Sequence, residues 1–163
     1  MWQEAAPACE AHPYLLEKLV KPHGIRQRND VLLVPMRDAS GELWGVQTIT
    51  PDGAKRFLRD ARKRGLHALG GAIVDVLAIC EGYATAASVH EATGYPVAVA
   101  FDAGNLEPVA KTLREKYTNA KIIICGDDDS GTEERTGRNP GRHCAEAAAR
   151  AVGGIVALPE FLQ

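Results

Sequence analysis

KIIICGDDDSG, at residues 121–131, joins an apolar run to a cluster of acidic residues. Ile122 to Cys125 are apolar, Asp127 to Asp129 are three consecutive carboxylates, and Gly131 follows. An unbroken run rich in β-branched residues predicts a buried strand of a parallel sheet. The carboxylates that follow such a strand come to lie at the carboxyl edge of the sheet, where open α/β folds bind ligands.

Three adjacent carboxylates repel one another and require an explanation. The repulsion is about 4 kcal/mol for a pair of unit charges at about 4 Å when the effective dielectric constant is about 20. Mg²⁺ offsets such repulsion, because it prefers oxygen ligands and takes one or two protein carboxylates together with phosphate oxygens. The alternative is an acidic solvated loop, since Asp and Gly also favour turns. Both interpretations stay open from this segment alone.

The composition indicates a globular protein. The chain has 163 residues, of which 45% are hydrophobic and 25% are charged, which suits one domain or one domain with a small appendage. No apolar run approaches the roughly 20 residues that span a membrane, and the first residues do not resemble a secretory signal. Four cysteines lie far apart without a C-x-x-C pair. We therefore expect neither a zinc finger nor a disulfide framework. We expect a cytoplasmic protein, because its cysteines suit a reducing compartment.

Residues 1–70 predict a helix and a small antiparallel sheet. Residues 1–11 are expected to form a loose lead-in, and Pro35 favours an edge or the end of a strand. Turn sequences at Asp38–Gly41 and Pro51–Gly53 separate the strands. The expected elements are a helix over His12–Val20 and strands over Val31–Met36, Glu42–Thr50 and Lys55–Leu58.

Residues 71–163 change to alternating strands and helices. This alternation predicts a parallel sheet with right-handed crossovers and helices on both faces. We place the boundary between the two parts near Leu69-Gly70-Gly71. The expected strands are Val74–Cys80, Pro96–Phe101, Lys121–Gly126 and Ile155–Leu158, and the expected helices are Tyr83–Thr93, Leu106–Tyr117 and Gly141–Val152; Thr132–Pro140 has the composition of a polar loop.

Acidic residues follow two of the predicted parallel strands. Glu81 ends the first and the Asp127–Asp129 cluster ends another, so both come to one edge of the sheet if these strands are neighbours. Alone, Glu81 would be explained as an acidic residue at a helix N-terminus. Asp102 and Asn105 follow the strand between them, and their simplest role is a turn and a helix cap.

A short basic segment stands out in a chain whose net charge is −2. Six cations lie within ten residues and only Asp60 opposes them. Such a cluster favours contact with nucleic-acid phosphates, and the alternative is a solvated surface. The six are Lys55, Arg56, Arg59, Arg62, Lys63 and Arg64.

These motifs together resemble the Toprim domain, which DnaG-type primases, topoisomerases and some nucleases share. The likeness is greatest to the primases of conjugative plasmids and satellite phages, and it extends over nearly the whole chain. Residues 30–70 resemble the segment that precedes Toprim in those primases. The other segments that carry the resemblance are Glu81–Thr93, Val97–Leu106, Ile123–Asp129, Asn139–Gly141 and Leu158–Phe161.

The resemblance implies a role for each matching residue. Glu81 corresponds to the Toprim glutamate, a general acid/base or metal ligand, and Asp127 and Asp129 correspond to the D-x-D pair that holds Mg²⁺ or Mn²⁺. The implied activity is that of the catalytic core of a DNA primase, which makes RNA primers on single-stranded DNA by metal-dependent nucleotidyl transfer during replication of a mobile element. The basic segment would then contact template or incoming NTPs.

The chain departs from this family at two points. It lacks the cysteines of the N-terminal zinc-binding module, and it ends before the further acidic motif and the helicase that many such primases carry. We therefore expect a fragment of a larger polypeptide, weakly active or inactive alone. A metal-dependent Toprim nuclease and a non-catalytic Toprim module that binds nucleic acid or protein are the alternatives.

Overall fold

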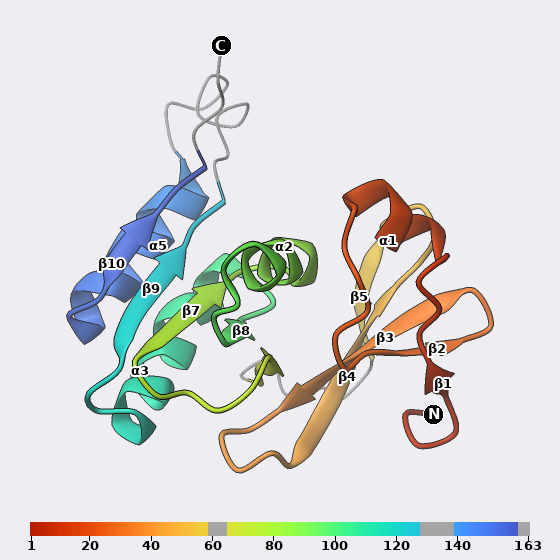
Figure 1. Cartoon of the computed structure of the whole chain (residues 1–163), viewed down its shortest axis with the longest axis horizontal. Coiled ribbons are helices and arrows are strands. Elements are labelled where there is room, and N and C mark those ends of the chain that lie inside the picture. Colours follow the sequence, from red (N-terminus) through yellow and green to blue (C-terminus); the bar gives the residue numbers. More distant parts are fainter. Residues whose placement is uncertain (59–64, 128–138, 160–163) are drawn as a thin grey trace.

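A computed structural model of the chain describes residues 1–58, 65–127 and 139–159. Within these residues the chain forms two five-stranded sheets, which lie side by side (Figure 1). Several predicted residues lie outside the described ranges, namely Arg59, Arg62, Lys63, Arg64, Asp128 and Asp129, together with most of the loop expected over Thr132–Pro140.

The first sheet is antiparallel with the strand order β1-β2-β3-β4-β5. The predicted succession of three strands is present as β3 to β5, and two further strands precede it. The loose lead-in expected over residues 1–11 is wrong, because Ala6 and Pro7 form the first of these strands, in which Ala6 pairs with Gln27. The elements are β1 (Ala6–Pro7), α1 (Pro13–Lys18), β2 (Arg26–Arg28), β3 (Val31–Arg37), β4 (Leu43–Ile49) and β5 (Lys55–Phe57).

Pro35 lies inside β3, which is the central strand of this sheet and not an edge strand. The strand tolerates it because β2 pairs with β3 only from Val31 to Leu33. At Pro35 the strand is paired with Val46 of β4. A proline that lacks the backbone N–H therefore occupies the part of β3 that β2 does not reach.

The second sheet has the order β10-β9-β7-β8-β6, and its first four strands are parallel. This confirms the predicted parallel sheet. β6 pairs antiparallel with β8 and precedes the boundary expected at residues 70–71. The elements are β6 (His67–Leu69), β7 (Val76–Cys80), α2 (Tyr83–Thr93), β8 (Val97–Val99), α3 (Leu106–Lys116), β9 (Lys121–Cys125), α5 (Pro140–Val152) and β10 (Ile155–Ala157).

Helices cover both faces of the second sheet, as predicted. On one face Leu77 and Ile79 pack in a cluster with α3 and α5. On the other face Cys80 packs with α2, and the same cluster includes Leu32 and Met36 of the first sheet. α2 therefore lies between the two sheets (Figure 1).

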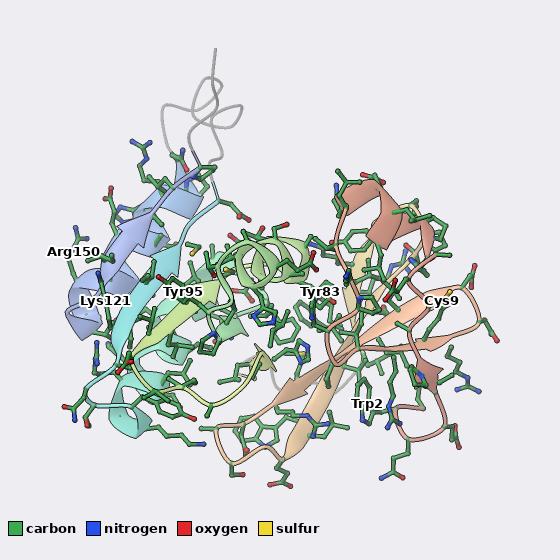
Figure 2. All side chains as sticks on the ribbon, in the orientation of Figure 1. Trp2, Cys9, Tyr83, Tyr95, Lys121 and Arg150 are labelled. Atoms are coloured by element: carbon green, nitrogen blue, oxygen red, sulfur yellow. The ribbon has the colours of Figure 1, made fainter. Side chains whose placement is uncertain are left out.

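Tyr83 connects the two parts of the chain by hydrogen bonds. Its hydroxyl accepts from the backbone N of His23 at 2.7 Å and donates to the carbonyl of Lys21 at 2.8 Å. Figure 2 shows Tyr83 between α2 and the first sheet. The side chain of Glu91, two turns further along α2, also accepts from the backbone N of Lys21 at 2.8 Å.

The longest helix that the structure describes, α5, has 13 residues. None of the helices in the described ranges combines the length and the apolar surface that crossing a lipid bilayer requires.

Candidate metal-binding edge

Two of the predicted acidic residues come together where β7 and β9 end. These strands are parallel neighbours, and Cys80 lies opposite Cys125 in the register. Glu81 follows Cys80 directly, and Asp127 follows Cys125 after one glycine. Because neighbouring strands lie about 4.8 Å apart, the backbones of Glu81 and Asp127 reach the same edge, as the sequence predicted. We call the region where β7, β8 and β9 end the carboxyl edge.

The two carboxylates have different neighbours at this edge. Oδ1 of Asp127 accepts from the Thr85 hydroxyl of α2 at 3.3 Å. The charge of Glu81 acts on the Cys144 thiol of α5. The carboxyl edge therefore carries these two acidic groups in the described residues.

The negative charges at this edge raise the pKa values of two nearby thiols. Burial raises the pKa of Cys144, and the charges of Glu81 and Asp102 raise it further. A hydrogen bond to Cys125 and burial raise the pKa of Cys80, and the charge of Asp127 adds to both effects. A negative charge disfavours the thiolate, so both thiols stay neutral and add no negative charge to that of the carboxylates.

Two hollows flank the carboxyl edge. A groove of about 680 Å³ lies on the α2 side. A second hollow of about 500 Å³ lies at the start of α5, where Asn139, His143 and Cys144 line it. The polar residues that line the groove come from both parts of the chain and are Tyr14, Lys18, Lys55, Thr85, Ser88 and Asp127.

The two described cations of the basic segment point in different directions. Lys55 lines the groove, and its Nζ lies 3.5 Å from the position that a β-carbon on Gly82 would take. Arg56 lines a separate hollow with Arg28 and Thr48 on the other face of the first sheet. Side chains alternate between faces along a strand. Lys55 alone of this pair therefore faces the carboxyl edge.

Asp102 and Asn105 have the capping and structural roles that were their simplest interpretation. The Asp102 side chain accepts from the backbone N of Asn105 at 2.9 Å and caps the short 3-10 turn Ala103–Asn105. Asn105 is buried and its amide donates to the carbonyls of Ala100 and Gly65. Asp102 nevertheless contributes its charge to the carboxyl edge.

The described donors suit a hard divalent cation. Glu81 and Asp127 supply carboxylate oxygens, which are the ligands that Mg²⁺ prefers. Both are partly exposed, so a cation with its remaining water or phosphate ligands has access. In residues 1–58, 65–127 and 139–159, no three Asp, Glu, His or Cys side chains form a metal-binding group. The third predicted ligand, Asp129, lies outside those ranges.

Thr85 and Lys18 are site residues that sequence reasoning missed. Thr85 lies four positions after Glu81, near the start of α2. A hydroxyl residue at this spacing after an acidic residue that ends a strand is the sequence signal that could have identified it. Lys18 ends α1 and has no such signal, because α1 and the carboxyl edge meet only in the tertiary structure.

Comparison with known proteins places this geometry in context. A family model described as the Toprim domain matches residues 75–157, about half of the chain. A curated protein of Escherichia coli named DNA primase TraC is 42% identical over 167 residues, which cover 98% of this chain and 16% of that protein. The chain therefore spans about a sixth of the length of this relative.

Solved structures show the same fold at low sequence identity. The primase fragment of the bacteriophage T7 primase-helicase protein has a TM-score of 0.64 and 17% identity, covering 99% of this chain and 69% of that one. A DnaG primase catalytic domain bound to ssDNA has a TM-score of 0.56 and 17% identity, covering 85% of this chain and 48% of that one.

Proposed function

Because the chain belongs to the Toprim domain family, we propose that it forms the catalytic core of a DNA primase, which makes RNA primers on single-stranded DNA during replication of a mobile element. The observation that carries this proposal is that Glu81 and Asp127 follow the paired residues Cys80 and Cys125, at the matching ends of the parallel strands β7 and β9. The 42% identity to a DNA primase over 98% of the chain supports it.

Glu81, Asp127 and Asp129 are the proposed ligands of Mg²⁺ or Mn²⁺. A bound divalent cation supplies Lewis-acid chemistry, since it neutralises nucleotide phosphates and lowers the pKa of an attacking 3′-hydroxyl. The chain's own contribution is to hold the carboxylates at one edge. Glu81 is further proposed as a general acid/base. Phosphoryl transfer depends chiefly on positioning and electrostatic stabilisation, and rigid strand ends provide the positioning.

The basic residues are proposed to contact nucleotide or template phosphates. Lys55 faces the groove that leads to Asp127, so it suits a phosphate near the metal. Arg56 faces away from that groove and suits a more distant phosphate of the template DNA. Arg59, Arg62, Lys63 and Arg64 complete the proposed set.

The partners and the cellular location follow from the same proposal. Single-stranded DNA and NTPs are the proposed substrates, and a solved relative of this fold is bound to ssDNA. The rest of the parent polypeptide, including a helicase or other domains, is proposed to complete the activity, so the isolated chain is weakly active or inactive. The cytoplasm is the proposed location.

The metal site is tested first, by NMR during titration with Mn²⁺. Paramagnetic broadening should remove the backbone amide signals of Glu81, Gly82, Gly126 and Asp127 together, since one ion lies close to both strand ends. Asp127→Asn should weaken the broadening at both segments while the remaining spectrum stays folded. Broadening near Asp127 with Glu81 unaffected would indicate a loose acidic loop and would favour the non-catalytic binding module.

The reaction is tested with the full-length parent protein. Incorporation of labelled NTPs on single-stranded DNA, lost in Asp127→Asn, is the expected result. Degradation of labelled DNA without incorporation would overturn the primase proposal and favour the Toprim nuclease.

A further inference from the structure

Thr85 connects α2 to the acidic end of β9. Its hydroxyl donates to Oδ1 of Asp127 at 3.3 Å, across 42 positions of sequence. Both side chains are partly buried, and both line the groove that also contains Lys55. The contact therefore joins two segments that are distant in sequence.

The structure holds Thr85 firmly in this position. α2 begins at Tyr83, with Gly82 as its N-cap, so the helix starts directly after Glu81. Ala86 and Ala87 are fully buried against the sheet, which places the neighbouring Thr85 on the flank of the helix nearest β9. Its position is thus set by packing and not by its own hydrogen bond.

A hydroxyl in this place controls how the carboxylate is presented. A donor to Oδ1 fixes the rotation of the carboxylate and leaves Oδ2 for another ligand. Hydrogen-bond partners behind metal-binding carboxylates act in this way, and their loss costs on the order of 10- to 100-fold in metal affinity or activity.

We propose that Thr85 is a positioning residue, which orients Asp127 for binding a divalent cation at the carboxyl edge. This inference rests on the proposed function, because it requires Asp127 to be a metal ligand. It adds a residue whose role is to act through Asp127 and not to touch the cation.

The chain offers a matched control on the same helix. Thr93 ends α2, and its hydroxyl donates to the carbonyl of Val89 within that helix. Thr93→Val therefore removes a hydroxyl from α2 without changing the surroundings of Asp127. Thr85→Ser keeps the hydroxyl and removes only the methyl group.

The test is Mn²⁺ affinity, measured from the EPR signal of free Mn²⁺ in titrations of the isolated chain. Thr85→Val should weaken the affinity about 10- to 100-fold, whereas Thr85→Ser and Thr93→Val should stay within about twofold of the wild type. Asp127→Asn should remove the binding that Thr85 supports. Thermal unfolding without metal establishes that each variant is folded, and Thr85→Ala replaces Thr85→Val if the latter is not.

The outcomes separate this inference from the proposed function. Wild-type Mn²⁺ affinity in Asp127→Asn would overturn the metal site itself, and the role of Thr85 with it. Loss of binding in Asp127→Asn with unchanged affinity in Thr85→Val would overturn only the role of Thr85. Equal weakening in Thr85→Ser and Thr85→Val would show that the hydroxyl is not responsible, and would also overturn it.

Discussion

His67 is a histidine held in the interior of the protein. Its side chain is 4% exposed, and its Nε2 lies 2.9 Å from the carbonyl oxygen of His23. Burial is the main cause that lowers its pKa, to about 4, and the charges of Arg37 and His23 act in the same direction. The hydrogen bond to the His23 carbonyl opposes this shift. His67 is therefore neutral near pH 7.

Acid should destabilise the fold through His67. The unfolded chain binds a proton at the ordinary pKa of about 6.5, so stability is full above that pH and is lost progressively as the pH falls towards 4. From these two pKa values we expect a loss of about 2 kcal/mol between pH 7 and pH 5. Urea unfolding at both pH values measures it.

The His67→Gln variant is the control for this pH effect. Glutamine retains a donor for the His23 carbonyl but does not titrate, so the loss between pH 7 and pH 5 should be smaller. An equal loss in the variant and the wild type would assign the effect to other groups.

Neighbouring residues in the sequence can serve different sites. Lys55 and Arg56 were predicted as parts of one basic segment, yet they line hollows on opposite faces of the first sheet. The number of cations revealed the segment, but the direction of each side chain depends on the strand and its register. The pairing of β5 with β4 sets that register.

At the scale of elements, the end of β9 is held by close packing at Gly126. A β-carbon at this position would lie 2.8 Å from Cβ of Ala145 on α5 and 2.9 Å from Cδ2 of Leu158. Ala145 is fully buried, so it cannot move aside. α5 and the segment after β10 are therefore what approach Gly126 closely.

Gly126→Ala should destabilise the protein by about 1–3 kcal/mol, the usual cost of overpacking a core. The added methyl group would push β9 away from α5. Chemical denaturation of the variant and the wild type measures the difference. Gly71→Ala is the matched control, since a β-carbon there meets nothing within 4 Å. A stability equal to the wild type in Gly126→Ala would contradict the packing at this strand end.

Apolar patterning explains which elements the sequence could predict. α2, α3, β7 and β9 have apolar or amphipathic patterns and lie within a few residues of their predicted bounds. β8 and β10 have only three residues each but were predicted, because all three are apolar. β1, β2 and β6 were missed because they are as short and contain no such apolar run.

At the scale of the whole molecule, the two parts share one apolar core. The cluster around α2 includes Ile25 and Leu32 of the first part as well as Tyr83 and Val97 of the second. The Tyr83 hydroxyl adds two hydrogen bonds across the same boundary. We therefore expect the two sheets to unfold together, as a single cooperative unit.

Tyr83→Phe should lower the free energy of unfolding by about 1–3 kcal/mol, because it leaves the His23 N–H without its acceptor. Urea unfolding is followed by two probes. Fluorescence reports the first sheet through Trp2 and Trp44, the two tryptophans of the chain, and circular dichroism reports mainly α2, α3 and α5. The two transitions should coincide in the wild type.

Tyr95→Phe is the control for this variant, because Tyr95 is 39% exposed. It should unfold like the wild type. Wild-type curves that separate by probe would show that the two parts are independent, and unchanged stability in Tyr83→Phe would remove Tyr83 from the link between them.

The sequence by itself determined the parallel sheet and the acids that follow two of its strands. These features are local, because apolar runs and helical periodicity indicate buried strands and helices without knowledge of their partners. An acidic residue that directly follows a strand must lie at the edge of the sheet where that strand ends. The tertiary structure alone decided that β7 and β9 are neighbours, that Thr85 contacts Asp127, and that Lys55 lies near Gly82 at the same edge. Those facts depend on strand order, register and packing between segments distant in sequence, and no local pattern contains them.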